Sequence, residues 1–254
     1  MSRILFLLYG VVCYLTFFLT FVYMVGFVND FHFQIGSFTF VPVAIDFGGS
    51  AASTVPAFII NTALIGLFGL QHSGMARRGF KAVWTRVLVP KAVERSTYVL
   101  ASSLCLILLM AFWRPMPSVI WAVHNETLAH VLTALSLLGF GIILLASFLI
   151  NHFELFGLQQ VFMHAKGAPL TPIAFKSPGI YKLVRHPIYF GFLMFAWVTP
   201  LMTVGHLLFA VGSLVYILIG YKLEEKDLIH QYGDTYRQYQ DRVHGLVPFP
   251  KGKG

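Results

Sequence analysis

The chain has 254 residues, of which 57% are hydrophobic and only 11% are charged. This composition lies outside the range of soluble domains and predicts an integral membrane protein. A formal net charge of +8 would suggest nucleic-acid binding in a soluble protein, but here the Lys and Arg residues flank hydrophobic runs, so membrane topology explains them and nucleic-acid binding is excluded.

The hydrophobic runs predict an all-α fold, a polytopic membrane bundle of five to six helices. A membrane helix needs roughly 20 apolar residues, and four runs reach or approach that length, at residues 4–28, about 54–70, 97–113 and about 130–150. The first run follows Arg3 as a signal peptide would. It is too long for one and lacks a small-residue cleavage site, so we expect a retained anchor.

Two shorter runs, 188–202 and 207–222, are separated by only four residues. So short a connection predicts a C-terminal helical hairpin. The first arm is short for a complete crossing, which leaves five and six membrane helices both open.

The basic residues predict the orientation of the chain in the membrane. Six of them lie between the second and third runs, whereas residues 29–53 contain none; the six are Arg77, Arg78, Lys81, Arg86, Lys91 and Arg95. Because cytoplasmic loops carry the excess of Lys and Arg, we expect both termini on the cytoplasmic side of a bacterial inner membrane.

Two further helices are expected on that side. Residues 71–96 place Trp84 and several aliphatic residues among the bases, which predicts an amphipathic helix on the inner leaflet. Near the C-terminus a helical spacing predicts a tail helix, carried by Tyr232, Tyr236, Tyr239 and Val243. Its aromatic stripe packs on the protein or lipid surface, or covers a bound cofactor.

Polar residues gather at the predicted cytoplasmic ends of the runs. They are His72, Glu94, Arg95, Asn151, His152, Glu154, Arg185, His186, Glu224 and Glu225. Snorkelling accounts for Arg and Lys at such depths, but less well for Glu, His and Asn. We therefore expect a polar site at the inner membrane face. The apolar runs carry no charge near their middles, which argues against an ion-coupled transporter.

The junction before residue 188 predicts an anion site. Pro187 is well suited to the first position of a helix, where the following amide groups are unpaired, and Arg185 and His186 stand just before it. With Glu224 and Glu225 opposite, the set matches a zwitterionic amino-acid moiety.

No metal is expected, because no histidine pair has helical zinc spacing with a third ligand nearby. Cys13 and Cys105 lie in separate apolar runs and predict neither a disulfide nor a metal site.

These residues also resemble known families. The segment GIYKLVRHPIYFG, followed by the hairpin, EE, YGDTYRQY and Pro248, resembles the cofactor-binding half of isoprenylcysteine carboxyl methyltransferases and phospholipid methyltransferases. The earlier segments LQHSGMARRGFKAVWTR, VERSTYVL and INHFELFGLQQ resemble the bacterial methanethiol S-methyltransferases and the related NnrU membrane proteins. We therefore expect a single membrane domain, 1–254, with residues 1–175 on the acceptor side and 176–254 as the cofactor-binding half.

The resemblance implies a reaction in which methanethiol and S-adenosylmethionine give dimethyl sulfide and S-adenosylhomocysteine. It implies cofactor binding by residues that match the family pattern, namely Tyr181, Arg185, His186, Tyr189, Gly191, Glu224 and Glu225. The implied partners are a small volatile thiol and the lipid bilayer.

The acceptor thiol should ionise above about 8.5, the value for cysteine, so a base would help at neutral pH. The candidates are His72 or Glu94, with Arg77 or Arg95 as electrostatic support. Asn151 and His152 are expected to line the acceptor pocket, or else to fix a helix end.

Two other functions stay open at this point. One is methylation of a lipid or prenyl acceptor, which would need an apolar groove opening into the bilayer. The other is a non-enzymatic, NnrU-like transport or haem-associated role, supported by the ten histidines.

Overall fold

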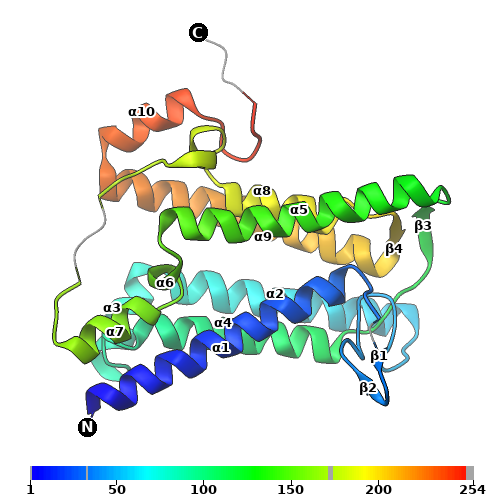
Figure 1. The fold of residues 1–254 in the computed structure, drawn as a ribbon, viewed down its shortest axis with the longest axis horizontal. Coiled ribbons are helices and arrows are strands. Elements are labelled where there is room, and N and C mark those ends of the chain that lie inside the picture. Colours follow the sequence, from blue (N-terminus) through cyan, green and yellow to red (C-terminus); the bar gives the residue numbers. More distant parts are fainter. Residues whose placement is uncertain (1, 33, 171–173, 250–254) are drawn as a thin grey trace. The chain divides into compact units, whose positions relative to one another are not determined.

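The computed structural model of the chain describes residues 2–32, 34–170 and 174–249. It is an all-α fold, as predicted (Figure 1). The chain forms two compact units, which are described separately. The first unit comprises Met1–Trp121, Phe153–Thr171 and Leu201–Phe209, and the second comprises Ala122–His152, Pro172–Pro200 and Ala210–Gly254. The expected functional division at residue 175 stays a prediction.

Among the residues that the structure describes, five helices are long and apolar enough to cross a membrane, which confirms a polytopic bundle. They are α1 (Ser2–Val28), α2 (Thr54–Ala76), α4 (Glu94–Phe112), α5 (Glu126–Ile150) and α9 (Val204–Tyr232). The shorter arm of the predicted hairpin is α8 (Pro187–Trp197), with 11 residues. At 1.5 Å per residue it extends about 16 Å, roughly half of the hydrocarbon thickness.

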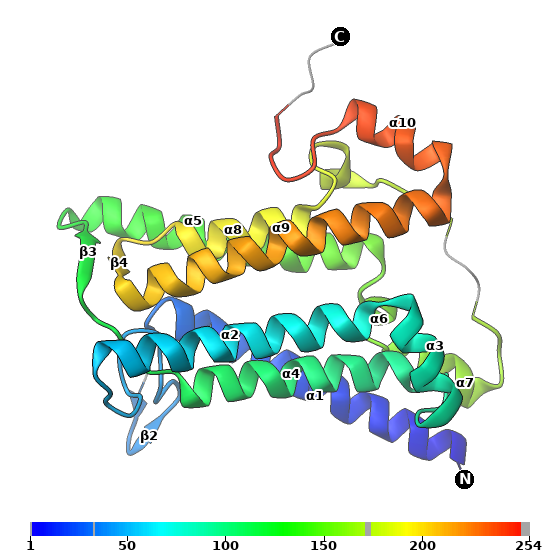
Figure 2. The same ribbon diagram turned by 180° about the vertical axis from the view of Figure 1, so that it is seen from behind.

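In the first unit, α1, α2 and α4 run side by side in both views (Figures 1 and 2). The α7 helix (Leu158–Lys166) packs on α1, where Gly10 faces Val161. Asn61 of α2 is completely buried and bonds to the chain just after α4: its Nδ2 donates to the carbonyl of Arg114 at 2.8 Å, and its Oδ1 accepts from the Arg114 amide at 2.9 Å.

The remaining elements of this unit are short. The α3 helix (Arg78–Val87) follows α2 and is the expected amphipathic helix, with Val83 and Val87 exposed. Strands β1 (Gln34–Ile35) and β2 (Phe38–Thr39) pair antiparallel, and β3 (Val119–Ala122) pairs with β4 (Leu201–Thr203). The α6 helix (His152–Leu155) crosses the boundary between the two units along the chain: His152 ends a segment of the second unit, and Phe153 begins a segment of the first.

The second unit is built on the close packing of α5 and α8. A Cβ on Gly139 would lie 2.6 Å from the carbonyl oxygen of Gly191, and a Cβ on Gly191 would lie 2.5 Å from the carbonyl oxygen of Gly139. Ser136 donates a hydrogen bond to the Phe195 carbonyl across the same contact. The two backbones therefore approach as closely as glycine allows.

The second unit also contains η1 (Gly179–Lys182), residues 210–232 of α9, and α10 (Asp234–Arg242). The predicted tail stripe packs on the protein: Tyr236, Tyr239 and Val243 form a buried cluster with Phe175 and α9. Gly233, at φ +56, ends α9 before α10 begins, so Tyr232 belongs to α9 rather than to the tail helix.

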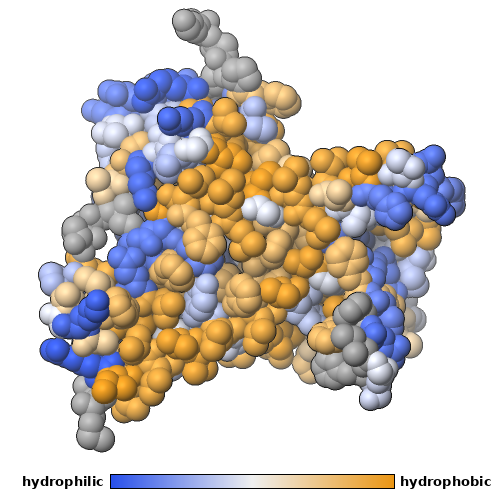
Figure 3. Space-filling model, viewed as in Figure 1, coloured by the Kyte–Doolittle hydropathy of each residue, from blue (hydrophilic) through white to orange (hydrophobic). Residues whose placement is uncertain are grey.

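The long helices present apolar side chains outward, and Figure 3 shows such side chains over α1. The exposed residues of that helix include Ile4, Leu8, Val12, Leu15 and Leu19. Exposed apolar side chains along a helix of membrane length are suited to contact with lipid.

Candidate functional site

The centre of the second unit's polar cluster is the Glu225 carboxylate near the end of α9. Arg185 donates to it through two parallel bonds, Nε to Oε1 and Nη2 to Oε2, both 3.0 Å long. His186 Nε2 lies 2.7 Å from Oε1, and the Tyr236 hydroxyl donates to the same oxygen at 2.7 Å. Gln240 Nε2 also donates to Oε2. The Glu225 carboxylate is thus a fully bonded, buried anion.

Arg185 has no N–H group left for another anion. Its Nη2 also donates to the Tyr221 hydroxyl at 2.8 Å, and its Nη1 donates to the carbonyls of Gln240 and Val243. A guanidinium has five N–H donors, and all five are engaged. Burial disfavours its charge, but bonding to Glu225 outweighs this and raises the pKa of Arg185. The guanidinium therefore holds α9 and the C-terminal segment in place, and contact of Arg185 with a cofactor anion stays a prediction.

His186 lies between two carboxylates. Its Nδ1 is 3.4 Å from Oε2 of Glu224, and its Nε2 bonds to Glu225. Its ring stacks on Tyr189 with centroids 5.4 Å apart and meets the edge of Tyr221. Burial disfavours the charged imidazole, but hydrogen bonds and charge from Glu224 and Glu225 outweigh it and raise the pKa of His186.

Glu224 differs from its neighbour by being accessible. Its side chain is 46% exposed, against 10% for Glu225. The Tyr189 hydroxyl also bonds to the Glu224 carboxylate. Of the predicted carboxylate pair, Glu225 is thus internal and Glu224 faces outward.

The segment just before α8 is hydrogen-bonded to the C-terminal tail, the residues that follow α10. Pro187 occupies the first turn as predicted, and the amides of Arg185 and His186 donate to the carbonyls of His244 and Gly245, at 2.8 and 3.0 Å. This pairing of residues 184–186 with 243–245 was not expected, because strand-like pairing of so short a segment has no periodic signal.

The other two expected cofactor residues have packing roles. Tyr181 is buried, its hydroxyl donates to the Ala146 carbonyl at 3.3 Å, and burial raises its pKa. Gly191 serves the contact of α8 with α5. Their roles in cofactor binding stay predictions.

The pKa of His186 predicts how stability depends on pH. Because the folded pKa is raised above the ordinary value of 6.5, the stabilisation from charged His186 is complete below that value and is lost as pH rises through the higher folded pKa. Thermal unfolding of detergent-solubilised protein should show the wild-type midpoint falling over this interval relative to a His186→Gln variant. Parallel curves for the two proteins would mean that His186 is not charged in the folded state.

In the first unit, two of the four predicted catalytic residues meet at Tyr98. His72 Nε2 lies 2.7 Å from the Tyr98 hydroxyl, and His72 Nδ1 lies 3.0 Å from the Ser102 hydroxyl. The Arg95 guanidinium lies 5.1 Å from the centre of the Tyr98 ring, and Arg95 Nε donates to the Leu155 carbonyl. Sequence reasoning missed Tyr98 and Ser102, although they share with Arg95 a helical spacing of three and four residues.

The other two predicted catalytic residues lie at helix ends. Glu94 is half-buried in the first turn of α4. Arg77 follows α2, and its Nε donates to the Ser73 carbonyl at 3.2 Å.

Asn151 and His152 close α5 in the second unit. The Asn151 amide bonds to the Ser147 carbonyl, and His152 Nδ1 lies 2.8 Å from the Ser147 hydroxyl. The His152 ring lies flat on Phe148, with centroids 4.1 Å apart, and burial lowers its pKa. These contacts fix the helix end, which was one of the two expected roles; a place in the acceptor pocket stays a prediction.

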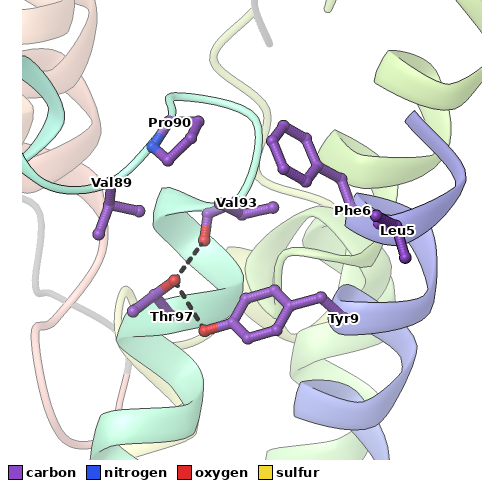
Figure 4. Close-up of a pocket in the computed structure, with 7 residues that line it drawn as sticks. All are labelled: Leu5, Phe6, Tyr9, Val89, Pro90, Val93 and Thr97. Atoms are coloured by element: carbon purple, nitrogen blue, oxygen red, sulfur yellow. Dashed lines mark hydrogen bonds between the residues drawn. The ribbon is translucent and has the colours of Figure 1, made fainter. Parts of the chain in front are cut away.

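The first unit also contains an apolar cavity of about 380 Å³, shown in Figure 4. Its polar groups are Thr97 and the Tyr9 hydroxyl, which lies 3.0 Å from Thr97 Oγ1. None of the predicted site residues lines it; the lining residues are Leu5, Phe6, Tyr9, Val89, Pro90, Val93 and Thr97.

Within residues 2–32, 34–170 and 174–249, no three His, Cys, Asp or Glu side chains are grouped as metal ligands.

Comparison with known proteins identifies relatives along nearly the whole chain. Residues 82–243 match a family described as "Protein of unknown function (DUF1295)". A protein of Bradyrhizobium diazoefficiens named methanethiol S-methyltransferase 1 is 50% identical, over 95% of this chain and 81% of its own length. Proteins named methanethiol S-methyltransferase from Crocosphaera subtropica and Mycobacterium tuberculosis are 47% and 46% identical, each over 98% of this chain and over 94% and 98% of their own lengths.

No solved structure matches the chain significantly. A sequence identity of 46–50% over 95–98% of this chain establishes membership of the family. The matched part includes both the segment around His72 and the cluster around Glu225. The chain therefore belongs to the methanethiol S-methyltransferase family of membrane proteins, within DUF1295.

Proposed function

We propose that this protein transfers a methyl group from S-adenosylmethionine to methanethiol, releasing dimethyl sulfide and S-adenosylhomocysteine. The observation that carries the proposal is 46–50% identity, along nearly the whole chain, to three proteins named as methanethiol S-methyltransferases. The reaction belongs at the cytoplasmic face of a bacterial inner membrane, with both termini cytoplasmic, because the basic residues concentrate in loops on one side.

The residues around the start of α8 fit the methionine part of such a donor. That part carries one ammonium and one carboxylate. The accessible carboxylate of Glu224 suits the ammonium, and the amide end of α8 beyond Pro187 suits the carboxylate. Tyr189, bonded to Glu224 and stacked on His186, provides an adjacent aromatic face.

Arg185 and Glu225 have a supporting role in this proposal. Their paired bonds fix the end of α9 against the segment before α8, so that Glu224 and Pro187 keep their places in the second unit. A fixed geometry matters because displacement at a methyl carbon depends mainly on alignment of the reacting atoms.

The bound donor supplies an electrophilic methyl group on a positively charged sulfur. The leaving sulfur departs uncharged, so the proposed reaction needs no metal. The protein has to hold the acceptor and favour its thiolate. For that task we propose His72 or Glu94 as the base, Arg77 or Arg95 as the nearby positive charge, and Asn151 and His152 as acceptor-binding residues.

Binding calorimetry on the detergent-purified protein tests the donor site. Both S-adenosylmethionine and S-adenosylhomocysteine should bind, and Glu224→Gln should weaken both about 10-fold, the equivalent of about 1.4 kcal/mol. Glu126→Gln, which alters a carboxylate in the first turn of α5, is the matched control and should bind both normally. Failure of the wild-type protein to bind either compound would contradict the proposal.

A further inference from the structure

We infer that Tyr98 takes the proton from the acceptor thiol while passing its own proton to His72. The inference rests on the proposed function and deepens it by naming the group that meets the thiol. Tyr98 is a member of α4, His72 is a member of α2, and both belong to the first unit, so their geometry is fixed within one compact part of the chain.

The hydrogen bonds determine where each proton lies. The Ser102 hydroxyl donates to the carbonyl of Tyr98, one helical turn earlier, at 2.9 Å. A hydroxyl has a single proton, so Ser102 can only accept from His72 Nδ1, 3.0 Å away. His72 therefore carries its proton on Nδ1.

It follows that His72 Nε2 is the basic nitrogen of the ring. The Tyr98 hydroxyl, 2.7 Å away, must be the donor in that bond. The phenol proton thus already points at His72 Nε2. In this proton relay from the thiol through Tyr98 to His72, the lone pairs of Tyr98 Oη accept the thiol proton. If His72 took the thiol proton directly, it would first have to break its hydrogen bond to the Tyr98 hydroxyl.

The surroundings favour the partial negative charge that develops on Tyr98 Oη while its proton moves to His72. The Arg95 guanidinium lies 5.1 Å from the ring centre and is held there by the Leu155 carbonyl. Tyr98 and Ser102 are both more than nine-tenths buried, and charge interactions are stronger there than in water. Phe68 stacks on the His72 ring at 5.2 Å and can support the imidazolium.

The proton and electron movements balance. The S–H bond of methanethiol breaks, its proton goes to Tyr98 Oη, and the former phenol proton goes to His72 Nε2. The electron pair left on the acceptor sulfur forms the new bond to the methyl carbon, and the pair of the old carbon–sulfur bond leaves with the sulfur of the donor. His72 then loses its extra proton to water.

Tyr98→Phe tests the relay because it removes the hydroxyl and keeps the ring beside Arg95. General-base catalysis is worth about 10²–10⁴-fold, so kcat with methanethiol should fall by about 10²-fold or more, with donor affinity unchanged. Methaneselenol is largely ionised at neutral pH and needs no base, so its methylation should proceed at nearly the wild-type rate. Tyr9→Phe removes a hydroxyl of α1 that is hydrogen-bonded to Thr97 of α4, and it should change neither rate.

A measurement without substrate checks the proton positions. Nitrogen NMR of histidine-labelled protein, with the His72 signals assigned from a His72→Gln variant, should show His72 protonated on Nδ1. In Tyr98→Phe the Nε2 signal should move toward that of an unbonded acceptor nitrogen. A His72 protonated on Nε2 would contradict the relay whatever the rates are.

The rates separate this inference from the proposed function. Equal losses with methanethiol and methaneselenol, or no loss with either, would contradict the relay and leave thiol methylation standing. A wild-type protein that methylates neither acceptor would contradict the proposed function and the relay with it.

Discussion

Glu225→Gln should lower the free energy of unfolding by about 3–5 kcal/mol, the usual cost of breaking a buried ion pair by removing one partner. The substitution keeps the shape of the side chain and removes its charge. Arg185 would then stay buried, 6% exposed, with its positive charge unbalanced. His186 and Tyr236 would lose the anion to which they bond.

The effect should be visible as a drop of about 10 °C in the unfolding temperature of detergent-solubilised protein. Glu224→Gln is the matched control, since it makes the same change one residue earlier at a half-exposed position, where ion pairs contribute about 0–1 kcal/mol. Equal, small shifts for the two variants would show that the Arg185–Glu225 pair does not hold the second unit together.

Alanine in place of Gly139 or Gly191 should destabilise the second unit by about 1–3 kcal/mol, the cost of overpacking a tight contact. The new methyl group would lie 2.6 or 2.5 Å from a backbone carbonyl oxygen of the other helix. A backbone atom cannot swing aside as a long side chain can, so α5 and α8 would have to separate.

Gly141→Ala is the control on the same helix. A Cβ there meets nothing within 4 Å, and alanine is favoured over glycine in a helix by about 1 kcal/mol. The two alanine substitutions in α5 should therefore shift the unfolding temperature in opposite directions. Shifts of the same sign would mean that the Gly139–Gly191 approach is not the packing contact of this helix pair.

The presence of each long apolar helix could be predicted from the sequence, but the residues at which the helices begin and end could not be predicted from hydropathy alone. The apolar run of the last long helix stops near residue 222, yet α9 continues to Tyr232 because Lys, Leu and Glu favour helix and no Gly or Pro follows until Gly233. At the start of α5, Asn125 caps the helix by accepting from the Leu128 amide at 2.9 Å. That capping signal was present in the sequence about five residues before the apolar run.

The candidate site shows the same limit. Residue types and positions indicated that Arg185, His186 and Glu225 act together, but not that Arg185 would use all five donors inside the protein. Its partners Tyr221, Gln240 and Val243 are set by how α9, α10 and the tail fold onto one another. His72 was recognised as a candidate base. Tyr98 lies in the segment VERSTYVL that resembles the family, but it was singled out only by its 2.7 Å bond to His72.

The most direct test of the proposed function is headspace analysis after mixing purified protein, methanethiol and S-adenosylmethionine that carries a deuterated methyl group. The account predicts dimethyl sulfide with one labelled and one unlabelled methyl group, formed only when protein, thiol and donor are all present. Donor binding without labelled dimethyl sulfide would contradict thiol methylation and direct the search to lipid or prenyl acceptors.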